Sequence, residues 1–184
     1  MSGGPAPQEG WLVVVDLQDV FRDEDSPWTA PRFDEVRPRI RRLVGAFGER
    51  VVWTRFIAPG EPVGAWQDYY EQYDFALQPP DAEMYRLVED PGAHPVVDAT
   101  TFGKWGPDLA AVVGQGPLTV VGVATECCVL STVLPAADAG IAVRVVTDAC
   151  AGAGDEEHER ALQVMGGYAP LVTFATTAEV LGGA

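Results

Sequence analysis

The sequence predicts an α/β fold of three layers, in which a doubly wound, mostly parallel sheet has helices on both faces. Two observations predict it. Apolar runs without polar alternation, such as residues 11–15 and 118–123, are typical of strands that are buried on both sides. Segments with helical periodicity, such as residues 34–49, alternate with these runs, which is the pattern of parallel strands joined by crossover helices.

In the first part of the chain, two predicted strands flank a helix. Residues 11–15 form an apolar run that ends at Asp16. Residues 34–49 carry apolar side chains at every third or fourth position, and Gly48 is expected to close this helix. Residues 51–54, rich in β-branched and aromatic side chains, predict the second strand.

Residues 57–95 are irregular and rich in proline and aromatic residues, with one short helix expected near residues 65–73. The segment is longer than an ordinary connecting loop. Segments of this length in a compact domain are usually lids or binding loops. The alternative is that its aromatic residues pack a subunit interface.

The second part of the chain continues the alternation. A strand, a helix and a strand are predicted at residues 95–98, 107–113 and 118–123. A helical stretch to about residue 139 follows, with Thr125 as its candidate N-cap and with Pro135 expected to kink or shorten it. Strand, helix, strand and a last helical turn are then predicted at residues 141–146, 155–165, 171–174 and 176–181.

The composition is that of an ordinary globular protein, with 47% hydrophobic and 21% charged residues in 184. We expect a flexible N-terminus at residues 1–9 and a single domain over residues 10–184. No apolar run approaches the length of a membrane span, the start lacks a signal-peptide pattern, and three cysteines suit a reducing compartment, so a cytoplasmic protein is expected. The net charge of -15 disfavours nucleic acid or an anionic membrane as a partner.

Polar residues that can do chemistry gather at one edge of the predicted sheet. Ligands of such sheets bind outside the carboxyl ends of the strands. Asp16 ends the first strand, and Cys128 follows the strand at residues 118–123. Lys104, the only lysine among 12 basic residues, lies in the loop shortly before that strand. We therefore expect Asp16 as base, Lys104 as cation and Cys128 as nucleophile at one site.

The two adjacent cysteines are expected to differ in role. With Thr125 as N-cap, the Cys128 sulfur would lie over unpaired amides at the start of a helix, which favours its thiolate. Neighbouring helical positions point about 100° apart, so Cys127 is expected to pack in the interior instead of facing the same substrate. Histidine is scarce: His94 lies in the irregular segment and His158 on a predicted surface helix, so a carboxylate is the expected base.

Four motifs occur in order along the chain: VVDLQDVF (residues 14–21), FGKWG (102–106), GVATECCV (122–129) and the stretch 140–149 that ends VVTDA. Together they resemble the cysteine hydrolase superfamily that includes isochorismatases, nicotinamidases and N-carbamoylsarcosine amidases. The resemblance covers nearly the whole chain from Trp11 onward. It implies an isochorismatase-like fold and, because relatives are commonly homo-oligomers, a homo-oligomer.

The resemblance also implies roles for individual residues. Its catalytic triad falls on Asp16, Lys104 and Cys128, because the family's nucleophile stands directly before the valine of a T-x-x-C-V pattern. It implies a cis peptide bond before Ala124, and an oxyanion hole formed by the amides of Ala124 and Cys128. Phe21 occupies the family's aromatic position in the substrate pocket, with a core phenylalanine as the alternative.

Other aromatic residues are candidates for the substrate pocket. Trp66, Tyr69 and Tyr70 of the irregular segment, with Trp105 beside the lysine, suggest a wall for a small planar or ring-bearing amide. Nicotinamidases bind a metal through an aspartate and histidines after their second strand. Residues 54–60 contain no histidine, so neither a metal nor another cofactor is expected.

The expected function is therefore hydrolysis of a C–N bond in a small amide, ureido or carbamoyl compound through a thioester on Cys128. The first alternative is a vinyl ether hydrolase of the isochorismatase type, whose chemistry does not need a thiol. The second is a non-catalytic or redox-sensing binding protein on the same fold. A nucleotide-binding module is disfavoured, because no glycine-rich turn follows the first strand.

Overall fold

The structure is a computed structural model that describes residues 10–182. The predicted flexible N-terminus, residues 1–9, lies outside the described residues. Six strands form one sheet, and every neighbouring pair is parallel, which confirms the predicted α/β class. The strands are β1 (Trp11–Val15), β2 (Val51–Phe56), β3 (Val96–Ala99), β4 (Leu118–Val123), β5 (Val143–Ala151) and β6 (Val172–Ala175).

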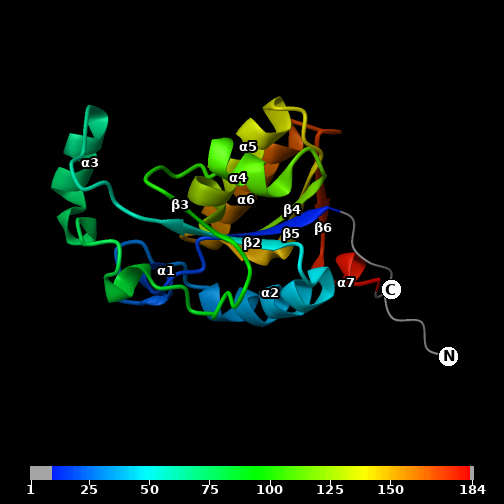
Figure 1. Ribbon diagram of the computed structural model, residues 1–184, viewed down its shortest axis with the longest axis horizontal. Coiled ribbons are helices and arrows are strands. Elements are labelled where there is room, and N and C mark those ends of the chain that lie inside the picture. The colour runs from blue at the N-terminus through cyan, green and yellow to red at the C-terminus, as the bar shows by residue number, and fades with distance from the viewer. Residues whose placement is uncertain (1–9, 183–184) are drawn as a thin grey trace.

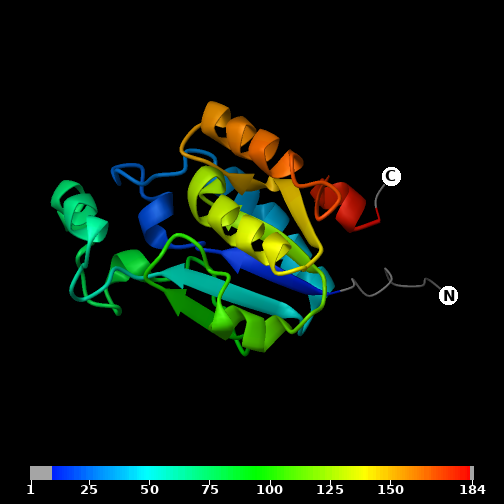
Figure 2. The same cartoon turned by 90° about the horizontal axis from the view of Figure 1, so that it is seen from above.

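Helices cover both faces of the sheet (Figure 1). One face carries α4 (Pro107–Val113), α5 (Leu130–Asp138) and α6 (Asp155–Gly166), and the other carries α2 (Phe33–Phe47) and α7 (Thr177–Val180). Figure 2 shows α5 and α6 side by side above the sheet. Within residues 10–182, no helix is both long and apolar enough to cross a membrane.

The core consists of two apolar clusters, one on each face of the sheet. Leu12 and Val14 of β1 belong to the cluster that α2 covers, whereas Val13 and Val15 belong to the cluster under α4, α5 and α6. Side chains of a strand point alternately to its two faces, so a strand buried on both faces needs apolar residues at every position. This explains the unbroken apolar runs in the sequence.

The strand order places the middle of the sheet at the start of the chain. The order is β3-β2-β1-β4-β5-β6, so the direction of winding reverses between β1 and β4. At such a reversal the loops that follow the two strands separate and leave a crevice outside their carboxyl ends. Asp16 directly follows β1, and Cys128 lies five residues after the end of β4.

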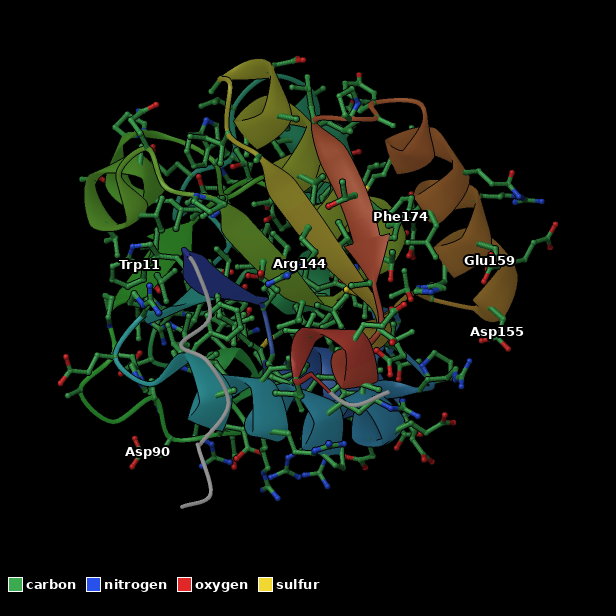
Figure 3. The ribbon with its side chains drawn as sticks, turned by 90° about the vertical axis from the view of Figure 1, so that its right-hand side faces the viewer. Trp11, Asp90, Arg144, Asp155, Glu159 and Phe174 are labelled. Atoms are coloured by element: carbon green, nitrogen blue, oxygen red, sulfur yellow. The ribbon has the colours of Figure 1, made fainter. Side chains whose placement is uncertain are left out.

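The edges of the sheet are β3 and β6. Figure 3 shows β6 next to α6, with α7 and α2 below them in that view. Phe174 of β6 is labelled there and is 41% exposed. Arg144 of the neighbouring β5 donates hydrogen bonds to the Thr119 hydroxyl of β4. These bonds link the side chains of β5 and β4.

The sequence prediction and the structure differ at the end of β5 and directly after Asp16. β5 continues to Ala151, five residues beyond its predicted end at residue 146, because its polar residues Thr147 and Asp148 end the apolar signal without ending the pairing. A short helix that the sequence analysis missed, α1 (Asp19–Arg22), follows Asp16. α2 ends at Phe47 with Gly48 as its C-cap, as predicted.

The irregular segment contains α3 (Ala65–Gln72) and two 3-10 turns, Asp74–Ala76 and Glu83–Tyr85. α3 stands beyond the carboxyl ends of the strands, on the left in Figures 1 and 2. The fully buried Gln18 holds the base of the segment: its side-chain amide donates to the carbonyls of Phe56 (3.0 Å) and Tyr85 (2.9 Å). The segment is therefore anchored on the core while α3 reaches over the crevice.

Gly122 allows β1 and β4 to approach each other just before Asp16. Its φ is +121°, and a Cβ atom at this position would lie 2.1 Å from the carbonyl oxygen of Val15. No side chain fits in that space, and the backbone conformation is one that glycine alone adopts easily.

Gly122→Ala is expected to lower the free energy of unfolding by about 2–5 kcal/mol, because the methyl group meets the Val15 carbonyl and the backbone is strained. Gly45→Ala is the matched control, since an added Cβ at this position, two residues before the end of α2, meets nothing within 4 Å. This control should raise stability by about 0.5–1 kcal/mol. Urea denaturation followed by circular dichroism measures both, and equal effects at the two glycines would contradict the close approach.

Candidate active site

Asp16 lies fully buried where β1 ends. One carboxylate oxygen, Oδ1, accepts a hydrogen bond of 2.6 Å from the Thr54 hydroxyl of β2. The same hydroxyl accepts a 3.2 Å hydrogen bond from the Asp16 amide. The φ of Asp16 is +48°, in the left-handed region that few residues other than glycine adopt. Thr54 thus holds the side chain and the backbone of Asp16 at the head of the crevice.

Lys104 forms a buried ion pair with this carboxylate. Its Nζ lies 2.8 Å from Oδ2 of Asp16, and both side chains are 0% exposed. Nζ also donates to the carbonyls of Thr101 and Phe102, each at 2.8 Å. An ammonium group has three N–H donors, and each one here faces an acceptor. A guanidinium holds its donors in one plane, so an arginine is not equivalent to this compact ammonium.

Cys128 lies in a π-helical turn, Thr125–Val129, that joins β4 to α5. The predicted N-cap at Thr125 is wrong: the hydroxyl of Thr125 contacts Nδ1 of His158 at 2.8 Å, and the residue is inside the turn. The amides of Cys127 and Val129 both donate to the Ala124 carbonyl at 3.1 Å, which widens the turn beyond an α-helical one. The Val123–Ala124 peptide bond is cis, as the resemblance implies.

The surroundings of Cys128 favour the protonated form of its thiol. Burial raises its pKa well above the ordinary value, the negative charge of Asp16 raises the pKa further, and Lys104 lowers it. Burial and the Asp16 charge therefore oppose the thiolate that the start of a helix was expected to favour. A base must remove this proton before the sulfur can act as a nucleophile.

Thr132 connects the cysteine turn with the lysine loop. Its hydroxyl donates to the carbonyl of Cys128 at 2.6 Å and accepts a hydrogen bond of 3.0 Å from the amide of Lys104. Thr132 lies on α5, one helical turn after the cysteine. It therefore sets the position of the Cys128 backbone relative to that of Lys104.

Gly103 brings the lysine loop against α5. A Cβ atom at Gly103 would lie 2.4 Å from the carbonyl oxygen of Ser131. Pro135, four residues after Ser131, has no N–H to donate to that carbonyl, so the loop approaches a part of the helix that lacks its internal hydrogen bond. Pro135 was expected to kink or shorten the helix. α5 continues past it to Asp138, and the lysine loop packs where the proline leaves the Ser131 carbonyl without its helical donor.

A cavity of about 400 Å³ opens above Cys128. Six aromatic residues line it: Phe21, Trp28, Phe56, Tyr69, Tyr73 and Phe102. Its remaining lining residues are Pro27, Ala124, Glu126, Cys127, Cys128 and Ala153. The cavity has the size and the apolar walls of a small-molecule site.

Both adjacent cysteines line this cavity, although only one was expected to face it. The lining includes Ala124 and Glu126 as well, so the cavity runs along the π-helical turn and meets successive side chains. Cys127 also packs against the apolar cluster on the α5 side. Burial raises the pKa of Cys127, and the Glu126 charge raises it further.

The structure brings only some of the predicted pocket aromatics to the cavity. Phe21 and Tyr69 line it, whereas Trp66, Tyr70 and Trp105 do not. α3 presents Tyr69 and Tyr73, four residues apart, to the cavity, so Tyr70 points to another side and is 2% exposed. Trp66 packs behind the wall, with its ring centre 5.2 Å from that of Phe102. Trp105 packs against the cluster under α4, α5 and α6.

Sequence reasoning missed four of the lining aromatics: Trp28, Phe56, Tyr73 and Phe102. Trp28 is the centre of the wall, and its ring contacts those of Phe21, Phe56, Tyr69, Tyr73 and Phe75. Phe56 ends β2 and Phe102 stands two residues before Lys104, so the strand-end rule contained the signal for both. Trp28 lies in a loop without periodicity, and no local pattern indicated its place.

The residues present do not fit the metal site of nicotinamidases. Within residues 10–182, no group of three or more His, Cys, Asp and Glu side chains is placed to hold a metal ion. The ring nitrogens of His94 contact the carbonyls of Pro91 and Gly48, and His158 contacts Thr125.

Thr132→Val is expected to lower the free energy of unfolding by about 1–3 kcal/mol, because the buried amide of Lys104 loses its acceptor. Thr132→Ser is the matched control, since it keeps the hydroxyl and loses only a methyl group, and it should lose less stability. Urea denaturation of the two variants measures the difference. Equal losses would contradict the bridging role of the hydroxyl.

The chain matches the model of one known protein family. The family model for the isochorismatase domain matches residues 10–179. No curated protein matches the chain.

Three similar solved structures share the fold, and at these identities the likeness shows the fold alone. A cysteine hydrolase from Pseudomonas syringae pv. phaseolicola 1448A has a TM-score of 0.79 and 20% identity, over 96% of both chains. The pyrazinamidase of Pyrococcus horikoshii, solved in complex with zinc, has a TM-score of 0.73 and 24% identity, over 90% of this chain and 97% of its own. The MAR1 ribonuclease from Caenorhabditis elegans has a TM-score of 0.66 and 22% identity, over 98% of this chain and 83% of its own.

The family model spans nearly all of the described residues and therefore shows the family. The chain belongs to the isochorismatase family.

Proposed function

We propose that the protein hydrolyses a C–N bond in a small amide, ureido or carbamoyl compound, with Cys128 as nucleophile, Asp16 as base and Lys104 as cation. The observation that carries this proposal is the ion pair of Asp16 and Lys104, with both side chains 0% exposed, beside the Cys128 thiol. Burying two charges costs free energy, and apolar residues in their place would stabilise the fold as well or better. The ion pair therefore supports a chemical role for this site.

The first step is attack on the carbonyl. Asp16 accepts the thiol proton as the Cys128 sulfur bonds to the carbonyl carbon of the substrate, and the carbonyl π electrons move to its oxygen. The raised pKa of the Cys128 thiol suits this order, because the proton then leaves as the C–S bond forms. The amides of Ala124 and Cys128 donate to the oxyanion, and the Lys104 ammonium balances its charge.

The second step releases the amine and then the acid. The oxyanion collapses, the C–N bond breaks, and Asp16 returns its proton to the leaving nitrogen, which leaves as ammonia or an amine. Asp16 then accepts a proton from a water molecule that attacks the thioester. Collapse of that intermediate breaks the C–S bond, yields the carboxylic acid, and returns the proton to the sulfur.

The other two functions fit the site less well. Vinyl ether hydrolysis of the isochorismatase type does not use a thiol, and it leaves Cys128 beside the ion pair without a role. A redox-sensing cysteine is typically exposed and has a lowered pKa. Cys128 is 2% exposed, and burial raises its pKa.

Cys128→Ala is expected to reduce ammonia release from small amides and ureas by about three orders of magnitude or more, because the nucleophile is lost. A screen of such compounds with an ammonia assay measures it, and circular dichroism checks the fold. Cys127→Ser is the matched control, and it should retain most of the turnover. The reverse pattern would assign the nucleophile to Cys127.

Asp16→Asn is expected to abolish turnover and yet make Cys128 easier to alkylate. The Asp16 charge raises the pKa of the thiol, so its removal lowers that pKa and increases the thiolate fraction at mildly alkaline pH. Iodoacetamide labelling at a series of pH values, with mass spectrometry of the Cys128 peptide, measures the shift. Lys104→Met should move labelling to higher pH, since Lys104 lowers the pKa. Slower labelling in the Asp16 variant would contradict the proposed coupling.

A further inference from the structure

The cavity wall carries negative charge and no positive charge. Glu126 is the single charged side chain among the lining residues, and none of them is basic. The Asp16 and Lys104 side chains lie beneath the floor and form a pair with each other. A substrate in the cavity therefore meets one uncompensated negative charge, which disfavours an anionic group and favours a cationic one.

Glu126 has acceptor capacity that the protein does not use. Its Oε1 accepts a hydrogen bond of 3.0 Å from the amide of Ala153. Its Oε2 is shielded from solvent and, among the described residues, accepts no hydrogen bond. A carboxylate has about four lone-pair sites, and an unsatisfied buried acceptor costs about 1–3 kcal/mol. A donor on a bound ligand would relieve that cost.

Gly152 makes room for this carboxylate at the wall. A Cβ atom at Gly152 would lie 2.5 Å from Oε2 of Glu126. The terminal torsion of a glutamate is broad, so rotation of the whole carboxylate, with both oxygens moving together, can bring an oxygen to face a ligand.

The aromatic rings favour the same kind of ligand. Six aromatic residues line the cavity, with Trp28 at the centre of the wall. The face of an aromatic ring carries partial negative charge and attracts a cation within about 6 Å of its centre, most strongly for tryptophan. Rings and carboxylate together form an environment typical of ammonium recognition.

We propose that the substrates of this site are cationic amides, whose ammonium or amidinium group pairs with Glu126 while the scissile carbonyl lies over Cys128. Glu126 stands two residues before Cys128 in the same turn. One small molecule can therefore carry both the cationic group at Glu126 and the carbonyl at Cys128. The inference rests on the proposed C–N hydrolysis for the position of the carbonyl. It assigns to Glu126 a role in selecting the substrate and no part in bond cleavage.

Three benzamides of similar size test the charge preference: 4-(aminomethyl)benzamide is cationic, 4-(hydroxymethyl)benzamide is neutral and 4-carbamoylbenzoate is anionic. Their dissociation constants are measured by calorimetry on the Cys128→Ala protein, so that binding is observed without turnover. The cation is expected to bind at least about ten-fold more tightly than the neutral compound, and the anion more weakly than both.

Glu126→Gln, added to Cys128→Ala, removes the charge and keeps an oxygen for the Ala153 amide. It is expected to reduce the ratio of cation to neutral affinity to about one. Glu49→Gln is the matched control, because it removes the same charge at an exposed position. Glu49 precedes β2 and lies at the amino ends of the strands, away from the cavity, so this variant should leave that ratio unchanged.

Equal binding of the cation and the neutral compound, or a ratio that Glu126→Gln does not change, would overturn the inference. Absence of binding by all three compounds at millimolar concentration would overturn it too. Ammonia release by the wild-type protein is a separate measurement on the same compounds. A cation preference in binding without ammonia release supports the role of Glu126 and counts against the proposed hydrolysis.

Discussion

The buried ion pair between Asp16 and Lys104 is the constraint on which the rest of the site depends. Two charges in a protein interior persist only if every donor and acceptor around them is satisfied, and removal of one partner costs about 3–5 kcal/mol. The Thr54 hydroxyl and two loop carbonyls supply those contacts. Thr132 then ties the lysine loop to the cysteine turn. The sequence motifs around these residues are therefore parts of one hydrogen-bonded unit that spans β1, β2, the lysine loop and α5.

The cavity above this unit combines segments that are distant in the chain. Its rings come from α1, the loop before α2, β2, α3 and the lysine loop, and Trp28 contacts most of them. Gln18 belongs to the same motif as Asp16 and anchors the segment that carries α3. The first motif thus positions both the Asp16 carboxylate and the segment that supplies part of the cavity wall. In the proposed reaction, chemistry and substrate recognition would be coupled through a stretch of three residues.

The sequence was informative wherever local pattern decides the structure. Apolar runs predicted all six strands, and the strand-end rule predicted that Asp16 and Cys128 meet at one edge. Sequence-based prediction failed where a residue distant in the chain determines the local structure. Thr125 has the side chain of an N-cap, but His158, 33 residues later, takes its hydroxyl. The face that α3 presents to the cavity depends on Trp28 and Phe102, which no helical periodicity reveals. The raised pKa of Cys128 follows from burial, which a motif does not report.

The ion pair has a further consequence for the energetics of the proposed reaction. A carboxylate, an ammonium, a thiol and a neutral carbonyl group sum to zero charge. After attack, a carboxylic acid, the ammonium and an oxyanion also sum to zero, and so do the groups present at the thioester. The reaction centre stays electroneutral from start to finish. Each step moves charge over a few ångströms without adding net charge to the low-dielectric interior. No step therefore carries the cost of transferring a charge from water into the protein.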